Sequence, residues 1–326
     1  MEETKPEIDS KIHRIVAAAE RFTESVGRVI VGKKEAIQSV FIGLLCGGHL
    51  LIEDVPGVGK TLLAKAAARS LGCSFKRIQC TPDLLPADVT GLHYFNQKSS
   101  EFEFRPGPIL ANLVLVDEIN RAMPRTQSCL LECMQEQQVT VDWHTFSLPR
   151  PFLILATQNP IELEGTFPLP EAQLDRFLLR VKLGYPAAEE EEAILTRFRE
   201  TNPLDSLSAV LETGELLELQ RIFRQVFVDP SVRGYITALT RATRDHADIR
   251  LGGSPRSSLG LHSAAQALAA IQGRSFVIPD DIKSLALPLL GHRLLLKAEA
   301  RMRGKSEEDV LREILDGIPV PLEGPG

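Results

Sequence analysis

Apolar residues in the first half of this chain gather in short runs that alternate with longer segments of helical spacing. Each run has the length of one buried strand, and the runs cover residues 50–53, 75–80, 113–116, 152–156 and 177–183. Strands that alternate with helices favour a parallel sheet whose two faces are both covered. The pattern therefore predicts an α/β core, which we place at residues 1–185.

Beyond residue 185 the strand-like runs stop and helical spacing continues. A turn at residues 184–186 is followed by the acidic run 189–192. Acidic side chains are favourable in the first turn of a helix because of the helix dipole, so we interpret the run as a solvated helix start. The predicted helices cover residues 193–200, 211–226, 230–247, 259–272 and 279–295. Residues 186–326 are therefore expected to form a second, all-α domain.

Two segments of the core alternate apolar and polar residues strictly and predict hairpins, at about residues 91–105 and 138–148. In the first hairpin, Phe102 and Phe104 alternate with charged residues, and packing onto the sheet is the favoured interpretation for both. For Tyr94 and Trp143, packing and exposure both remain open.

The segment 54–61 lies between the first predicted strand and a helical run, which is the order that forms a phosphate cradle. Glycines let backbone N–H groups converge on an anion, and the helix N-terminus adds its dipole. Lys60 supplies a positive charge for the β- and γ-phosphates, and Thr61 offers a hydroxyl to Mg²⁺. Asp54 departs from the general motif, which has glycine there. The remaining nucleotide contacts are expected from Pro56, Gly57, Val58, Gly59 and Leu62.

A second candidate element is the apolar run 113–116, which ends in Asp117 and Glu118. The first carboxylate would hold the Mg²⁺ shell, largely through water, and the second would orient and deprotonate the attacking water. A strand that merely ends in an acidic turn is the alternative, and the phosphate loop about 55 residues upstream favours the catalytic interpretation.

Composition and charge limit which partners and which cellular compartment we expect for this protein. The 326 residues carry a net charge of −6 with a pI of about 5.7, which disfavours nucleic acid as a partner. No apolar run is long enough to span a bilayer, the N-terminus lacks a secretory signal, and five cysteines fit no disulfide framework, so we expect a cytoplasmic protein. Cys129 and Cys133 share a predicted helix face, where small core residues are favoured over metal ligands.

Six segments taken in order resemble the MoxR family of AAA+ ATPases, and the resemblance extends from about residue 29 to residue 296. The segments are 57–61, 104–109, 117–122, 156–160, 169–177 and 253–256. The resemblance implies an AAA+ phosphate-loop core with a parallel sheet between helices, followed by an all-α lid domain. The resemblance implies that an acidic residue at position 54 is a common variant in this family. We therefore expect the carboxylate of Asp54 to point away from the phosphates.

The resemblance also assigns roles to single residues. Asn159 matches sensor 1, although an Asn-Pro turn residue is the simpler interpretation of that position alone. Arg176 matches the arginine finger that reaches the nucleotide of a neighbouring subunit, against the alternative of a surface salt bridge with Asp175. Arg256 matches sensor 2, which would link the lid to the phosphates of its own subunit. The adenine would lie against Ile30, Val31 and Gly32.

Functionally, the resemblance implies an ATP-hydrolysing, chaperone-like remodeller that binds ATP or ADP with Mg²⁺ and acts as a homo-oligomeric ring, expected to be a hexamer. Protein clients, work in enzyme maturation or complex assembly, and a von Willebrand factor A domain partner belong to the same expectation. The hairpins would face the centre of the ring, where aromatic side chains could contact clients. A nucleotide-gated scaffold with little turnover is the alternative, and a DNA-translocating relative is a third, disfavoured by the acidic charge balance.

Overall fold

The computed structural model describes residues 5–159, 165–199 and 202–321. Its centre is a five-stranded parallel sheet with the order β2-β5-β8-β1-β9. The strands are β1 (Leu50–Glu53), β2 (Phe75–Gln79), β5 (Leu113–Asp117), β8 (Leu153–Gln158) and β9 (Leu179–Val181). All five predicted strands are confirmed with small shifts at their ends. The largest shift is at β9, because the preceding residue, Leu178, bonds the carbonyl of His49 outside the ladder.

Helices cover both faces of the sheet, and alternate strand residues show why. Leu50 and Ile52 join one apolar cluster with helices α1 (Lys5–Gly27), α2 (Lys34–Cys46) and α3 (Lys60–Ser70). Leu51, between them, joins a second cluster with α5 (Pro124–Glu136) on the opposite face. Strands buried on both sides read as continuous apolar runs in the sequence, which is the signal that predicted them.

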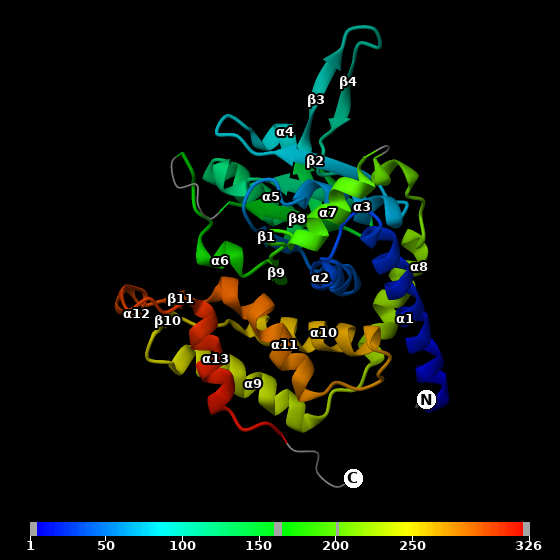
Figure 1. Cartoon of the computed structure of the whole chain (residues 1–326). Coiled ribbons are helices and arrows are strands. Elements are labelled where there is room, and N and C mark those ends of the chain that lie inside the picture. Colours follow the sequence, from blue (N-terminus) through cyan, green and yellow to red (C-terminus); the bar gives the residue numbers. More distant parts are fainter. Residues whose placement is uncertain (1–4, 160–164, 200–201, 322–326) are drawn as a thin grey trace.

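Two antiparallel hairpins extend from the core at the predicted places. They are β3 (Gly91–Asn96) with β4 (Glu101–Pro106), preceded by the short helix α4 (Pro86–Thr90), and β6 (Gln138–Val141) with β7 (His144–Ser147). Figure 1 shows β3 and β4 projecting away from the body of the molecule.

The aromatic side chains of the hairpins divide into packed and exposed. The ring of Phe104 stacks on that of Phe146 with centroids 4.2 Å apart, which joins the two hairpins. Phe104 is therefore packed, and its packing onto the sheet stays a prediction. Packing was the wrong expectation for Phe102, which is 71% exposed and meets Phe95 edge-on across the ribbon. Trp143 is 85% exposed and Tyr94 is 42% exposed. The structure thus presents aromatic rings on the projecting ribbon and on the neighbouring turn.

The C-terminal part is mainly helical, as predicted, and lies at the end of the molecule away from the β3–β4 hairpin (Figure 1). Its helices are α9 (Pro230–Asp245), α10 (Pro255–Ile271), α11 (Pro279–Leu290), α12 (Ala298–Met302) and α13 (Glu307–Gly317). It is not all-α, because a two-stranded ribbon of β10 (Ile249–Leu251) and β11 (Leu295–Leu296) joins it. The segment predicted as one helix over residues 279–295 therefore ends early, passes through a 3₁₀ turn (Gly291–Arg293) and finishes in β11.

The segment between the sheet and these helices stays close to the core. It contains α6 (Glu171–Leu174) before β9, then α7 (Ala188–Arg197) and α8 (Thr213–Ile222), with 3₁₀ turns at Pro203–Ser206 and Phe223–Gln225. A further 3₁₀ turn, Ile119–Arg121, follows β5 within the core. Helix α8 packs against α1 and α2, and α1 also packs against α10. One apolar cluster accordingly runs from the sheet into the C-terminal helices. The domain boundary at residue 185 stays a prediction. None of the described helices is both long and apolar enough to cross a bilayer.

Candidate nucleotide-binding site

The phosphate loop occupies the turn between β1 and α3, as its sequence predicts. Gly57 and Gly59 have φ of +87° and +96°, a left-handed conformation that side chains with a Cβ disfavour. Gly59 is the N-cap of α3, so the unpaired N–H groups of the first helical turn, which includes Thr61 and Leu62, are available to an anion. The Nζ of Lys60 donates to the backbone oxygen of Asp54 at 2.8 Å. The ammonium group therefore lies against the loop, beside the predicted phosphate position.

The carboxylate of Asp54 points away from this cradle, which confirms the expectation for that residue. Its Oδ2 accepts hydrogen bonds from the backbone N–H of Leu183 at 2.5 Å and of Gly184 at 2.7 Å, and Oδ1 accepts from Val55 N–H at 2.9 Å. These partners belong to the loop itself and to the chain leaving β9. Asp54 thus fastens the phosphate loop to the segment that leads into α7.

A cavity of about 220 Å³ adjoins the loop where the adenine contacts are predicted. Val31 lines it beside Ile30, opposite the glycines of the loop. Sequence reasoning missed the other wall, which comes from Ile194 of α7 and from Phe198 directly after it. Pro56 is exposed at the tip of the loop, and Gly57, Val58, Gly59 and Leu62 line the cavity. Apart from Lys33 the lining side chains are apolar, which suits the face of a purine base.

The acidic run at the start of α7 is a largely exposed helix start, as expected for Glu189, Glu191 and Glu192, whereas Glu190 is partly buried and makes contacts beside this cavity. Glu190 pairs with Lys33 at 3.1 Å and accepts the backbone N–H of Ala187 at 3.0 Å. These bonds hold the pKa of Glu190 below its ordinary value. Gly32 has φ +73°, and a Cβ built there would lie 1.8 Å from the Oε1 of Glu190. Any other residue at position 32 would therefore adopt a strained backbone conformation and would have to displace the side chain of Glu190.

Asp117 ends β5 at the same edge of the sheet, with both carboxylate oxygens engaged. Oδ2 accepts two hydrogen bonds from Arg77 of β2, at 2.6 and 3.1 Å, and Oδ1 accepts from the hydroxyl of Thr157 on β8 at 2.6 Å. The carboxylate of Asp117 and the hydroxyl of Thr61 are hard oxygen donors, which is the chemistry Mg²⁺ prefers. These two oxygen donors fit Mg²⁺ chemically. The ion pair with Arg77 shows that the carboxylate of Asp117 already faces a cation.

Glu118 follows with φ +56°, a strained conformation for a residue other than glycine and one that gathers at functional sites. Its Oε2 accepts from the side-chain amide of Gln79 at 3.0 Å and from Arg121 at 3.1 Å. Its backbone N–H donates to the hydroxyl of Thr157 at 2.8 Å. Thr157 thereby orients both acidic residues. Because these contacts join separate strands, no sequence spacing marked Arg77, Gln79 or Thr157.

Asn159 follows β8 directly and is buried. Its strand lies between β5 and β1, so Asn159 is at the same edge as the phosphate loop and the two carboxylates. Parallel strands bring their carboxyl ends together, and ligands of α/β sheets bind there. The structure thus gathers the loop, Asp117, Glu118 and Asn159 on one side of the sheet.

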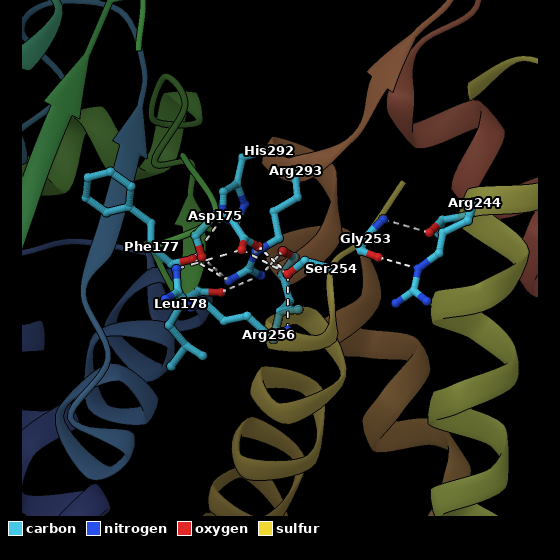
Figure 2. A network of polar contacts seen from close by, with 11 residues as sticks. Asp175, Phe177, Leu178, Arg244, Gly253, Ser254, Arg256, His292 and Arg293 are labelled. Atoms are coloured by element: carbon cyan, nitrogen blue, oxygen red, sulfur yellow. Dashed lines mark hydrogen bonds and ion pairs between the residues drawn. The ribbon is translucent and has the colours of Figure 1, made fainter. Parts of the chain in front are cut away.

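Arg176 and Arg256 lie at the other edge. Leu179 of β9 is level with Leu50 at the beginning of β1, and Asp175 precedes Leu179. The guanidinium of Arg256 is 3.8 Å from the carboxylate of Asp175 (Figure 2). It is therefore separated from the phosphate loop of its own chain by the length of β1, about 10 Å or more. The expected link between Arg256 and the phosphates of its own subunit stays a prediction, which this placement does not favour.

Arg176 lines a pocket of about 260 Å³ against the C-terminal half of α5. Within the described ranges of the chain it forms no ion pair, so the alternative of a salt bridge with Asp175 is wrong. Asp175 is engaged instead by Arg293 at 3.0 Å and by Ser254 at 2.9 and 3.0 Å. No sequence pattern predicts this arrangement, because Ser254 and Arg293 are far from Asp175 along the chain.

Comparisons with known proteins agree with these observations. Residues 49–179 match the ATPase family associated with various cellular activities (AAA), and residues 241–314 match the AAA lid domain. The uncharacterized protein YeaC of Bacillus subtilis is 50% identical over 92% of this chain and 94% of its own length. Chaperone MoxR1 of Mycobacterium tuberculosis is 43% identical over 94% of this chain and 83% of its own.

A solved structure of a candidate ATPase from Cytophaga hutchinsonii superposes with a TM-score of 0.90 at 38% identity and covers 96% of this chain and 98% of that one. The predicted fold, an α/β core followed by a helical lid, is confirmed by these matches together with the sheet itself. Such identity over nearly the whole chain, with the phosphate loop and both acidic residues in place, settles the family. The chain belongs to the MoxR family of AAA+ ATPases.

Proposed function

We propose that this chain hydrolyses ATP and uses the energy as a ring-shaped, chaperone-like remodeller of protein clients, in enzyme maturation or complex assembly. The observation that carries the proposal is the convergence of Lys60, Asp117 and Glu118 at one edge of the sheet, beside an apolar cavity of base-binding character. Glu118 has a strained backbone conformation, and polar side chains hold its carboxylate in place. Strain of this kind gathers at functional sites, so it favours a catalytic role over a structural one.

In the proposed reaction, ATP binds with its base between Val31 and α7 and its phosphates on the loop. Lys60 then exchanges the carbonyl of Asp54 for the β- and γ-phosphates. Thr61 and Asp117 would hold Mg²⁺, which when bound neutralises phosphate charge. Glu118 accepts a proton from the attacking water, and Asn159 orients that water.

Arg176 and Arg256 complete the site from a neighbouring subunit in this proposal. Both lie across the sheet from the phosphate loop of their own chain, and both side chains are partly exposed. Each chain thus carries the phosphate loop at one edge of the sheet and the two arginines at the other. Such a chain suits a head-to-tail contact between subunits, which closes into a ring when the rotation between neighbours permits. A hexamer is the ring we propose.

Client binding is assigned to the projecting hairpins. The chaperone name of the Mycobacterium relative supports this assignment. So do the exposed rings of Tyr94, Phe95, Phe102 and Trp143, since aromatic side chains are enriched in protein interfaces. A partner with a von Willebrand factor A domain and a cytoplasmic location remain part of the same proposal.

The scaffold alternative has two grounds, the departure of Asp54 from the general motif and the need for a ring that the sequence of one chain does not show. With its carboxylate turned away from the cradle, Asp54 gives no reason to expect loss of hydrolysis. Turnover is therefore favoured over nucleotide-gated assembly alone.

The test compares phosphate release by the wild-type protein and by Glu118→Gln, with nucleotide binding and light scattering followed in parallel. Loss of a positioned base should lower turnover by about 10²–10⁴-fold while binding and assembly persist. Glu299→Gln, on the exposed face of α12, is the matched control and should leave turnover unchanged. Equal turnover by wild type and Glu118→Gln would show that Glu118 is not the base, and ATP-dependent assembly without phosphate release would favour the scaffold.

A further inference from the structure

One core carboxylate, that of Asp175, receives three side chains of the C-terminal helices (Figure 2). Arg293 donates to its Oδ1 at 3.0 Å, the hydroxyl of Ser254 lies within 3.0 Å of both oxygens, and Arg256 is 3.8 Å from Oδ2. The Ser254 oxygen also accepts the backbone N–H of Arg256 and so caps α10. The start of α10 is therefore fixed to the residue that precedes Arg176.

Arg293 holds the backbone on both sides of Arg176. Its guanidinium donates to the carbonyl oxygens of Asp175 at 3.3 Å, Phe177 at 2.6 Å and Leu178 at 3.3 Å. His292 bonds the same Phe177 oxygen at 3.0 Å. The side chains of His292 and Arg293 thus pack the C-terminal helices onto this segment of the core.

Burial makes this attachment hard to break. The side chain of Arg293 is 3% exposed and that of Asp175 is 20% exposed. Desolvation lowers the pKa of Arg293 to about 10, and the negative charge of Asp175 opposes that fall. A buried arginine that loses its partner leaves an uncompensated charge, which is strongly unfavourable. The start of α10 and the Arg176 segment therefore move as one body.

Arg176 and Arg256 differ from this buried pair. The side chain of Arg256 is 47% exposed and only loosely held, and Arg176 has no ion pair in the part of the chain that the structure describes. Their guanidinium groups can therefore contact another molecule, whereas their backbones are both held by the contacts of Asp175 and Arg293.

We propose that Asp175 and Arg293 form a positioning unit, which sets Arg176 and Arg256 at one fixed spacing so that both reach the nucleotide of the neighbouring subunit together. The inference rests on the proposed function, because it requires that these arginines act across a subunit contact. It goes further by assigning Asp175 and Arg293 to the neighbour's reaction. An attachment that served stability alone would affect only the chain that contains it.

The experiment uses two full-length chains that are each inactive. The acceptor carries Arg176→Ala with Arg256→Ala, so it binds ATP and has no arginines to offer. The donor carries Lys60→Ala, so it offers its arginines and cannot hold phosphate. Phosphate release by the mixture reports arginines acting across the contact. The donor is then tested with Asp175→Asn and with Arg293→Gln added.

We expect Asp175→Asn or Arg293→Gln in the donor to lower release by the mixture about 10²-fold, a loss that a misplacement of about 1 Å can cause, with the affinity of the acceptor for ATP unchanged. Arg293→Lys should restore part of the rate, since the charge remains. Asp281→Asn in the donor is the matched control, because Asp281 forms a comparably buried pair with Arg274 at 2.6 Å within the lid. That donor should complement fully.

Two results distinguish failure of the proposed action across subunits from failure of the positioning role. If the unmodified donor and acceptor do not complement, the action across subunits is wrong, and the positioning role falls with it. If they complement and Asp175→Asn in the donor has no effect, the positioning role alone is overturned. Asp175→Asn placed instead in the acceptor, whose own arginines are already absent, should retain complementation and thereby shows that the substitution folds.

Discussion

Restoring glycine at position 54, as the general phosphate-loop motif has it, should damage this protein. The carboxylate of Asp54 is buried and accepts the backbone N–H groups of Leu183 and Gly184 at 2.5 and 2.7 Å. Asp54→Gly leaves both donors without a partner. The two bonds are the only contacts among the described residues that those N–H groups are recorded to make.

The expected loss follows from the kind of bond. A hydrogen bond to a charged group contributes about 1.5–3 kcal/mol, so two of them give about 3–6 kcal/mol. Glycine adds up to about 1 kcal/mol through the larger conformational entropy of the unfolded chain. The third bond, from Val55, is part-exposed and can be replaced by water. For a domain of this size the total corresponds to a fall in melting temperature of about 10 °C.

Thermal unfolding and fluorescent-nucleotide binding of Asp54→Gly and Asp54→Asn would measure the effect. Asparagine keeps one oxygen acceptor and should lose about half as much stability. Asp142→Gly is the control, since the same replacement at an exposed hairpin turn with φ +55° suits glycine and should change stability by less than about 1 kcal/mol. Wild-type stability and affinity in Asp54→Gly would refute the role assigned to this carboxylate.

Two further outcomes are expected. Gly32→Ala must displace Glu190 and adopt φ +73°, so it should lower stability by about 1–3 kcal/mol and weaken nucleotide binding, measured by melting and by titration, whereas Gly214→Ala in an open helical position should not. Burial lowers the pKa of His49 to about 4 and that of His292 well below its usual value. The unfolded chain therefore takes up protons first, and stability should fall by about 1.4 kcal/mol per pH unit for each histidine as pH drops below about 6.5. Urea unfolding should show a shallower fall for His49→Gln; an unchanged slope would exclude His49 as a source.

Local features of the site could be predicted from the sequence, and contacts between distant segments could not. The phosphate loop and Asp117 lie at the ends of strands whose burial on both faces makes them continuous apolar runs. Arg77 and Gln79 belong to β2, an edge strand with mostly exposed side chains, where polar residues have an ordinary explanation. Only the pairing of β2 with β5 brings Arg77 to Asp117.

Other features that the sequence did not predict have a similar cause. Strand β10 has three residues and β11 has two, too few for a period-two pattern to show. The acidic run at the start of α7 has the composition of a solvated helix, and its contact with Lys33 depends on a residue 157 positions away. The role expected for Arg256 came from family resemblance, which does not by itself say which edge of the sheet the residue occupies.

The segment from Asp175 to Gly184 connects the two halves of the proposed shared site. Arg293 and Ser254 hold its beginning, at the edge where Arg176 and Arg256 are presented. Asp54 of the phosphate loop holds its end through the N–H groups of Leu183 and Gly184. Between these points runs β9, whose backbone is fixed to β1 by the sheet ladder and cannot lengthen. A shift of the C-terminal helices that pulls on Asp175 must therefore either strain this ladder or move the phosphate loop. In a ring, the same strand would connect the nucleotide that a subunit holds to the arginines that it offers to the next.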